Sequence, residues 1–178
     1  MSFNITPSVF TDKKLSLDPL GLEAIPEDSR QPFLRFGFSN DNQALLPLKD
    51  TVKILQLNSL AILPVPDMPN WLVGVCNWCG DILWLVDFNI LMGEASLSHT
   101  IPVWEKPMAI VIEADGRSIG LAVEQIGEIE LLEPESIHQP QDFYSPILAP
   151  LIAGYLPEHR GIILDAKAVI ERSLQTSL

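Results

Sequence analysis

The sequence of 178 residues predicts an all-β protein, and three observations support this fold class. Residues 71–87 hold two runs of aliphatic, β-branched and aromatic residues around a turn-forming cluster at residues 77–81. Similar short apolar runs recur along the chain and indicate about nine or ten strands. Helix-length segments do not alternate with these runs, as they would in a parallel β/α sheet. The sequence therefore predicts a double β-barrel.

The first elements precede this central segment. Residues 1–31 lack a sustained period and are expected to form an N-terminal arm with at most one docking turn. Two apolar runs between residues 32 and 48 flank a turn cluster and predict a hairpin. In the next run, Val52 and Ile54 alternate with polar residues, which places them on one face of a half-buried strand. Residues 62–69 are interrupted by prolines and predict an extended connection or a sheet edge.

The elements after the central segment are a short helix and a second hairpin. Residues 88–93 allow one or two helical turns that end at a glycine. The polar residues 94–106 are typical of a crossing between two lobes. Residues 108–123 predict a hairpin with its turn at Asp115 and Gly116.

The last third of the chain completes the barrel. A strand with a bend at Gly127 is expected to extend the preceding sheet through Ile126, Ile129, Leu131 and Leu132. Residues 151–164 predict a final hairpin. Residues 165–174 have a helical apolar face, and Asp165 stands near the start of this predicted helix.

The charge balance limits the classes of partner. The chain has 11 basic and 23 acidic residues, a formal net charge of −12 at pH 7. This charge repels phosphate backbones and anionic membrane surfaces, so nucleic-acid binding is not expected. The apolar runs are too short and too proline-rich for membrane insertion, and the start of the chain lacks the order of a signal peptide. We therefore expect a cytoplasmic protein.

One spacing in the central segment could carry chemistry, because Cys76 and Cys79 form a C-x-x-C pair. Redox pairs of this type usually begin a helix, whose dipole lowers the thiol pKa, whereas this pair falls on a β turn. A zinc site would need further ligands, and the histidines are scattered. Packing thiols are the favoured interpretation, and a thiol redox or metal protein is the alternative. No paired catalytic carboxylates or phosphate loop are found, so neither enzymatic activity nor a cofactor is expected.

An ordered series of residues runs through and around the central segment. It comprises Pro66, Pro69, Trp71, Leu72, Gly74, Val75, Asn77, Gly80, Ile82, Leu83, Asp87, Leu91 and Gly93. This series resembles the core of CheW-like domains, the adaptors of bacterial chemotaxis-type signalling, and the likeness extends over residues 33–170. It implies a CheW-like domain at residues 32–175, built from two five-stranded SH3-like β-barrel lobes with a boundary near residues 94–107 and a short C-terminal helix.

The resemblance also implies a function and its site residues. The expected protein is a non-enzymatic scaffold that couples a methyl-accepting chemoreceptor to a chemotaxis-type histidine kinase, in motility or pilus control. By position in the family pattern, the receptor is expected to contact Val52, Ile54, Asn77, Trp78 and Cys79. The kinase is expected to contact Gly74, Val75 and Ile82. A module that binds only the kinase, or competes for it, is the alternative.

Two of these receptor-side residues have competing interpretations. Trp78 can serve as an exposed anchor for a partner or as a core residue. Family members usually have arginine at the position of Cys79, so this chain lacks a planar cation with five hydrogen-bond donors. This difference indicates a dedicated partner or an apolar contact at this point.

Overall fold

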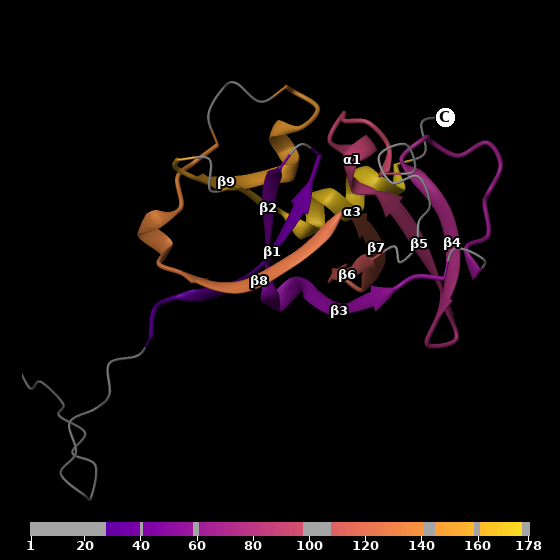
Figure 1. The fold of residues 1–178 in the computed structure, drawn as a ribbon, viewed down its shortest axis with the longest axis horizontal. Helices are drawn as coiled ribbons and strands as arrows, with labels where there is room; N and C mark the ends of the chain where they lie inside the picture. The colour runs from indigo at the N-terminus through magenta and orange to yellow at the C-terminus, as the bar shows by residue number, and fades with distance from the viewer. Residues whose placement is uncertain are drawn as a thin grey trace, which may run out of the picture.

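The computed structural model describes residues 28–39, 41–58, 61–97, 108–140, 145–158 and 161–175. In this part of the chain, ten strands form two five-stranded sheets that stand beside one another in Figure 1. Sheet A consists, in order across the sheet, of β8 (Gln125–Leu132), β1 (Gln31–Phe38), β2 (Asn42–Pro47), β10 (Gly161–Leu164) and β9 (Ile152–Leu156). Sheet B consists of β3 (Thr51–Gln56), β6 (Met108–Ala114), β7 (Arg117–Val123), β5 (Asp81–Asp87) and β4 (Leu72–Trp78). The predicted all-β fold with two five-stranded units is confirmed.

The predicted hairpins are present, and their turns explain their register. The turn between β4 and β5 places Cys79 at φ +54° and Gly80 at φ +92°. The turn between β6 and β7 places Asp115 at φ +51° and Gly116 at φ +71°. Two consecutive residues with positive φ match the right-handed twist of the strands they join, so these two-residue loops fix the pairing of each hairpin.

Both sheets have the same internal plan. In each, a hairpin is followed by an Asp-capped helix, and the second strand of the hairpin runs parallel to the central hairpin of the sheet. Asp87 accepts a hydrogen bond from the backbone N–H of Ile90 at the start of α1 (Phe88–Leu91). Asp165 accepts one from Ala168 at the start of α3 (Ala166–Leu174), which confirms the predicted terminal helix.

The sheets do not divide the chain into two consecutive halves. Strands β1 and β2, at the N-terminal end of the described chain, belong to sheet A together with β8, β9 and β10. The expected lobe boundary near residues 94–107 therefore falls within sheet B, between β5 and β6. Local turn chemistry predicts each hairpin, but long-range parallel pairing decides which sheet it joins. Most of the predicted crossing, and residues 1–27 of the predicted arm, lie outside the described residues.

Strand β8 has a different neighbour from the one predicted. It was expected to extend the sheet of β6 and β7, but it pairs with β1 in sheet A. The predicted bend at Gly127 is confirmed, because the register shifts between Leu34 and Phe36 opposite this residue. A side chain at Gly127 would stand 2.9 Å from the carbonyl oxygen of Arg35, which explains the glycine.

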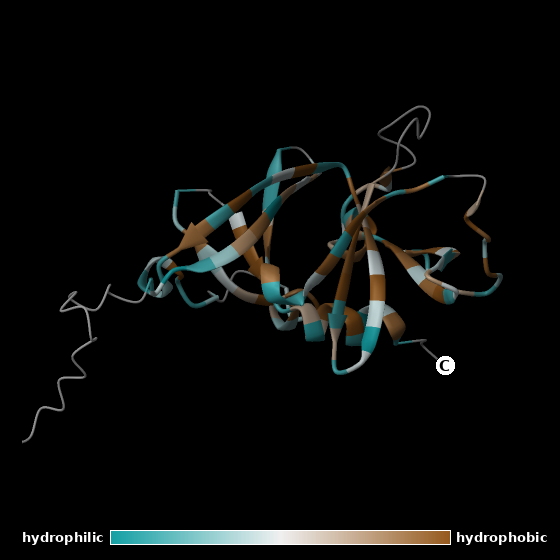
Figure 2. Cartoon of the chain, turned by 90° about the horizontal axis from the view of Figure 1, so that it is seen from below, coloured by the Kyte–Doolittle hydropathy of each residue, from teal (hydrophilic) through white to brown (hydrophobic). Residues whose placement is uncertain are grey.

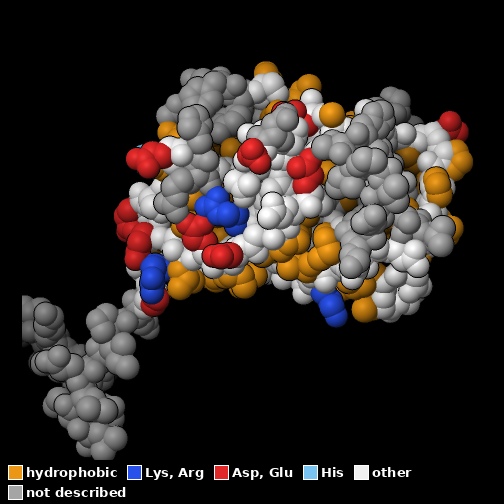
Figure 3. Space-filling view, viewed as in Figure 1, with side chains coloured by type: hydrophobic (Ala, Val, Ile, Leu, Met, Phe, Trp, Pro, Cys, Tyr) orange, Lys and Arg blue, Asp and Glu red, His pale blue; other side chains and the backbone are white. Residues whose placement is uncertain are grey.

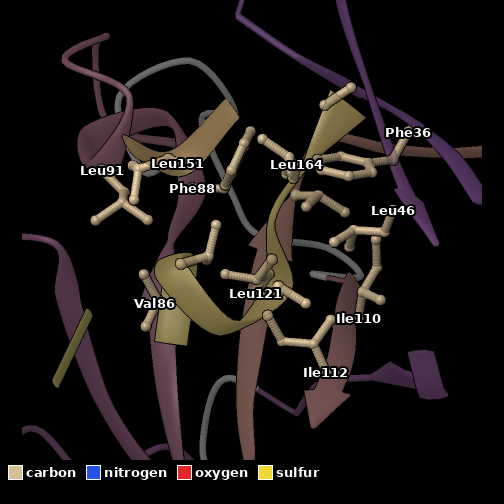
Figure 4. Packing of buried hydrophobic residues seen from close by; sticks show 14 of the residues in the cluster. Phe36, Leu46, Val86, Phe88, Leu91, Ile110, Ile112, Leu121, Leu151 and Leu164 are labelled. Atoms are coloured by element: carbon tan, nitrogen blue, oxygen red, sulfur yellow. The ribbon is translucent and has the colours of Figure 1, made fainter. Parts of the chain in front are cut away.

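A shared hydrophobic core joins the two sheets. It contains Phe36 and Leu46 from sheet A, Val86 and Ile110 from sheet B, and the buried face of α3, as Figure 4 shows. Hydrophobic residues recur along the strands of both sheets, between hydrophilic ones (Figure 2). A smaller cluster lies on the opposite face of each sheet: Phe33, Leu45, Leu132, Leu156 and Ile163 in sheet A, and Leu57, Leu83, Leu85, Ala109 and Val111 in sheet B.

Candidate partner-binding surfaces

The first candidate site is formed by two edge strands, β3 and β8. Val52 and Ile54 on β3 are 48% and 37% exposed, and Ile129 and Leu131 on β8 are 59% and 48% exposed. Hydrophobic side chains gather along the lower edge of the molecule, over β8 and beside β3 (Figure 3). We call these four residues the edge surface. Exposed aliphatic side chains grouped in this way are typical of a protein-binding site.

The register explains why the edge surface is apolar and yet exposed. Ile54 stands opposite Ile110, and Ile129 stands opposite Leu34. Ile110 and Leu34 are both buried in the shared core. Side chains of paired residues lie on the same face of a sheet, so Ile54 and Ile129 point toward the core side, but they sit on outermost strands that nothing covers within the described chain.

These exposures bear on the sequence predictions for both strands. Val52 and Ile54 are predicted on one face of a half-buried strand and as receptor-side residues; both side chains are exposed, and Val52 lies at a register shift between Thr51 and Lys53. Ile129 and Leu131 are predicted only as part of a strand that extends a sheet, and their place on a candidate site is not predicted from the sequence. Their alternation with Glu128 and Glu130 fits an exposed edge as well as a buried strand. The sequence carries no signal that separates the two cases.

The second candidate site lies on one face of the hairpin formed by β4 and β5. Leu63 exchanges two backbone hydrogen bonds with Val75, at 2.8 and 2.9 Å, and Asn77 stands opposite Ile82. Ile82 is 73% exposed and Leu63 is 64% exposed. We call Leu63, Val75, Asn77 and Ile82 the hairpin surface. It belongs to the edge of sheet B that is opposite β3, so it is separate from the edge surface.

The residues expected to contact the receptor and those expected to contact the kinase do not form two separate groups in the structure. Asn77, expected on the receptor side, and Ile82, expected on the kinase side, are cross-strand neighbours on one face. Trp78 is half-buried and packs against the smaller cluster of sheet B, which favours its interpretation as a core residue. Cys79 is exposed at the turn. Gly74 is buried and allows the backbone of Leu63 to approach β4, because a side chain at Gly74 would overlap the carbonyl oxygen of Leu63.

The two thiols have different environments. Cys76 is half-buried against the smaller cluster of sheet B, which contains Leu83 and Leu85, and this burial raises the pKa of its thiol. Cys79 lies exposed in the turn, and both cysteines are free thiols. A raised pKa keeps Cys76 protonated at neutral pH, whereas redox cysteines need a lowered pKa. The environment of Cys76 therefore disfavours the thiol redox alternative.

We predict that iodoacetamide alkylates Cys79 at least about tenfold faster than Cys76 at pH 8 in the folded protein. The reason is that only a thiolate reacts, and Cys76 is both shielded and held protonated. Peptide mass spectrometry during a time course gives both rates, and urea-unfolded protein is the control in which the rates converge. Faster alkylation of Cys76 in the folded state would contradict the described packing.

No group of three or more His, Cys, Asp or Glu side chains in the described part of the chain is arranged to hold a metal ion. None of the helices described is both long enough and apolar enough to span a bilayer.

Comparisons with known proteins agree on one family. The profile of the CheW-like domain family matches residues 33–174. The chain is 27% identical over 93 residues to "Chemotaxis protein CheW" of Rhizobium meliloti (strain 1021), a match that covers 52% of this chain and 57% of that protein. It is 21% identical over 143 residues to "Chemotaxis protein CheW" of Klebsiella aerogenes, which covers 79% of this chain and 81% of that protein.

A solved structure shares the fold. The crystal structure of the scaffolding protein TtCheW from Thermoanaerobacter tengcongensis superimposes with a TM-score of 0.68 and 18% sequence identity. The match covers 84% of this chain and 98% of that chain. This chain therefore shares its fold with that protein.

Proposed function

The chain belongs to the CheW-like domain family, and on this basis we propose that it is a non-catalytic adaptor that couples chemoreceptors to a chemotaxis-type histidine kinase. Its named relatives are chemotaxis proteins and its structural neighbour is a scaffolding protein, which supports a coupling role. The output would be the control of swimming or of pilus motility, and the adaptor would work in the cytoplasm at receptor arrays.

The observation that carries this proposal is the presence of two separate apolar surfaces. The edge surface lies on β3 and β8, and the hairpin surface lies at the opposite edge of sheet B. An adaptor must hold two partners at the same time, so it needs two sites that do not overlap. A rigid core between the sheets keeps both sites in a fixed relation.

We assign the receptor to the edge surface and the kinase to the hairpin surface. Val52 and Ile54 match receptor-side positions of the family, and the exposure of Ile129 and Leu131 on the other edge strand supports including them in this assignment. A row of aliphatic side chains of this kind suits the apolar face of a partner helix. Val75 and Ile82 match kinase-side positions, and we assign Asn77 to this side as well because it stands opposite Ile82.

The first test of this function is a pulldown of the purified protein with the cognate kinase and with the receptor, each alone and together. We predict that Ile82→Glu weakens kinase binding by about tenfold or more and leaves receptor binding unchanged, because a buried charge is costly at an interface centre. The double variant Ile129→Glu with Leu131→Glu should have the reverse effect.

Ile147→Glu is the matched control, because Ile147 is 61% exposed and lies outside both surfaces. It should bind both partners like the wild type. Kinase binding without any receptor binding would favour a kinase-only or competing module. Binding of neither partner would refute the adaptor function and would favour the alternative of a thiol redox or metal protein that uses Cys76 and Cys79.

A further inference from the structure

A pocket of about 610 Å³ lies beside β9 and β10, at the side of sheet A that is opposite β8. Its walls come mainly from the turn between β1 and β2, the segment that follows α1, and the ends of β9 and β10 at their turn. This volume lies within the range of about 300–1,000 Å³ that is usual for ligand sites. The pocket shares no residue with the edge surface or the hairpin surface, so it is a third candidate site.

The floor of the pocket is apolar and continues into the buried part of the molecule. Phe38 and Met92 line it, belong to the shared core, and are 6% and 8% exposed. Leu156 lines it from the smaller cluster of sheet A, and the half-buried Ile162 packs against the shared core. A ligand that covers this floor removes apolar surface from water, which favours aliphatic groups in the ligand.

Contacts between the two lobes hold the pocket in one shape. The hydroxyl of Ser39, which follows β1, donates a hydrogen bond of 3.3 Å to the carboxylate of Glu94, which follows α1. The ring of Phe38 lies 5.2 Å from that of Phe88 at the start of α1. The backbone N–H of Glu94 donates to the carbonyl oxygen of Asn89 at 2.8 Å. The pocket is therefore formed before a ligand arrives, and binding does not require its walls to become ordered.

The rim of the pocket carries negative charge. Asp41, Glu94 and Glu158 line the pocket, and all three residues are exposed. None of the described residues that line it is Lys, Arg or His, and residues 159 and 160 lie outside the described chain. A concave site with carboxylates at its opening attracts cations and repels acidic groups. The acidic rim and the apolar floor together favour a ligand that is both cationic and aliphatic.

We propose that this pocket binds a segment of a partner protein in which aliphatic residues are flanked by arginine or lysine. The aliphatic side chains cover the floor, and the flanking cations extend their apolar stems along the walls to reach the carboxylates of the rim. These carboxylates come from three separate segments of the chain, which suits a peptide with several cations better than a single small cation. The partner is a third one, additional to the receptor and the kinase, so the site goes beyond the coupling function.

Titration of the isotope-labelled full chain with short capped peptides, followed by NMR, tests the site. A peptide with the core Arg-Leu-Leu-Arg should shift the backbone amide signals of Asn42, Gln43, Tyr155 and Ile162, which line the pocket. A peptide with Glu-Leu-Leu-Glu should leave them in place, and one with Arg-Gly-Gly-Arg should bind about tenfold more weakly because it lacks apolar side chains. No shift of these signals at millimolar Arg-Leu-Leu-Arg peptide would overturn the proposal. Equal affinity for butylguanidinium would assign the pocket to a small cation instead and would also overturn it.

Two charge variants separate the rim from the net charge of the protein. Glu94→Gln with Glu158→Gln should raise the Kd of the Arg-Leu-Leu-Arg peptide about fivefold, because each exposed ion pair contributes modestly. Glu128→Gln with Glu135→Gln makes the same change of charge at exposed residues outside the pocket and should bind like the wild type. Equal Kd values in the two double variants would overturn the assignment of the rim.

A competition experiment tests whether the partner is a third one. The bound Arg-Leu-Leu-Arg peptide should leave the pulldown of the kinase and of the receptor unchanged, because the pocket shares no residue with either surface. Displacement of either protein by the peptide would overturn the third site. Peptide binding at the pocket by a protein that binds neither kinase nor receptor would support the pocket and refute the coupling function, so the two proposals fail separately.

Discussion

Replacing Phe88 by alanine is expected to lower the free energy of unfolding by about 3–5 kcal/mol. Phe88 is fully buried at the start of α1. Its ring lies 5.1 Å from that of Phe36 and 5.2 Å from that of Phe38, in edge-to-face geometry at 73° and 85°. Phe36 and Phe38 belong to sheet A, whereas α1 follows directly on β5 of sheet B. The substitution therefore leaves a cavity where the two sheets meet.

Urea unfolding followed by tryptophan fluorescence and by far-UV circular dichroism measures this effect. The described tryptophans Trp71, Trp78 and Trp84 all lie in or beside sheet B, and the fourth, Trp104, lies outside the described residues. In a Trp104→Phe background the fluorescence therefore reports mainly on sheet B. In Phe88→Ala we expect the two transitions to separate, because the aromatic contacts between the sheets are lost. Phe33→Ala is the control, since Phe33 is 3% exposed in the small cluster of sheet A alone. It should lose comparable stability with coincident transitions, and separation in both variants would contradict a coupling role for Phe88.

Much of the fold could be predicted from local chemistry. The two-residue turn at Cys79 and Gly80 and the Asp165 cap of α3 depend on neighbouring residues in the sequence, and the structure has both. Apolar runs on either side of such turns then define the hairpins. The elements themselves are therefore encoded locally.

The assembly of these elements could not be predicted in the same way. The parallel pairs β2 with β10 and β5 with β7 join segments that are far apart in the sequence. Ile126 packs against the shared core, whereas Ile129, three residues later on the same strand, is exposed. The two residues have the same side chain and differ only in their place along β8, where Ile126 stands opposite Phe36 and Ile129 stands opposite Leu34. Residue type cannot distinguish burial from binding here.

Gly74, which is predicted to contact the kinase, has a structural role in sheet B, and Gly154 has the same role in sheet A. In sheet B, the segment before β4 bonds to Val75 through Leu63, and Gly74 makes room for that carbonyl. In sheet A, the segment before β9 bonds to Tyr155 through His138, at 2.9 and 3.0 Å, and Gly154 makes room in the same way. The glycine belongs to the fold of each lobe, so its recurrence does not require a partner.

Gly74→Ala is consequently expected to destabilise the protein by about 3 kcal/mol, because the backbone has φ +150° and a methyl group would overlap the carbonyl of Leu63. Gly154→Ala should also destabilise, since its methyl group would stand 2.7 Å from Ile137 Cγ2 and 2.9 Å from the carbonyl oxygen of His138. Gly116→Ala, with open space around it, should cost only about 1 kcal/mol of strain. Thermal unfolding gives these differences.

Kinase binding separates the two glycine variants at a temperature where both remain folded. Gly74→Ala displaces Leu63 and Val75, which form part of the hairpin surface, and should weaken kinase binding by about tenfold. Gly154→Ala disturbs the equivalent place in sheet A and should bind the kinase like the wild type. Weakened binding in both variants would mean that stability alone controls the interaction, and normal binding in Gly74→Ala would remove Leu63 and Val75 from the kinase site.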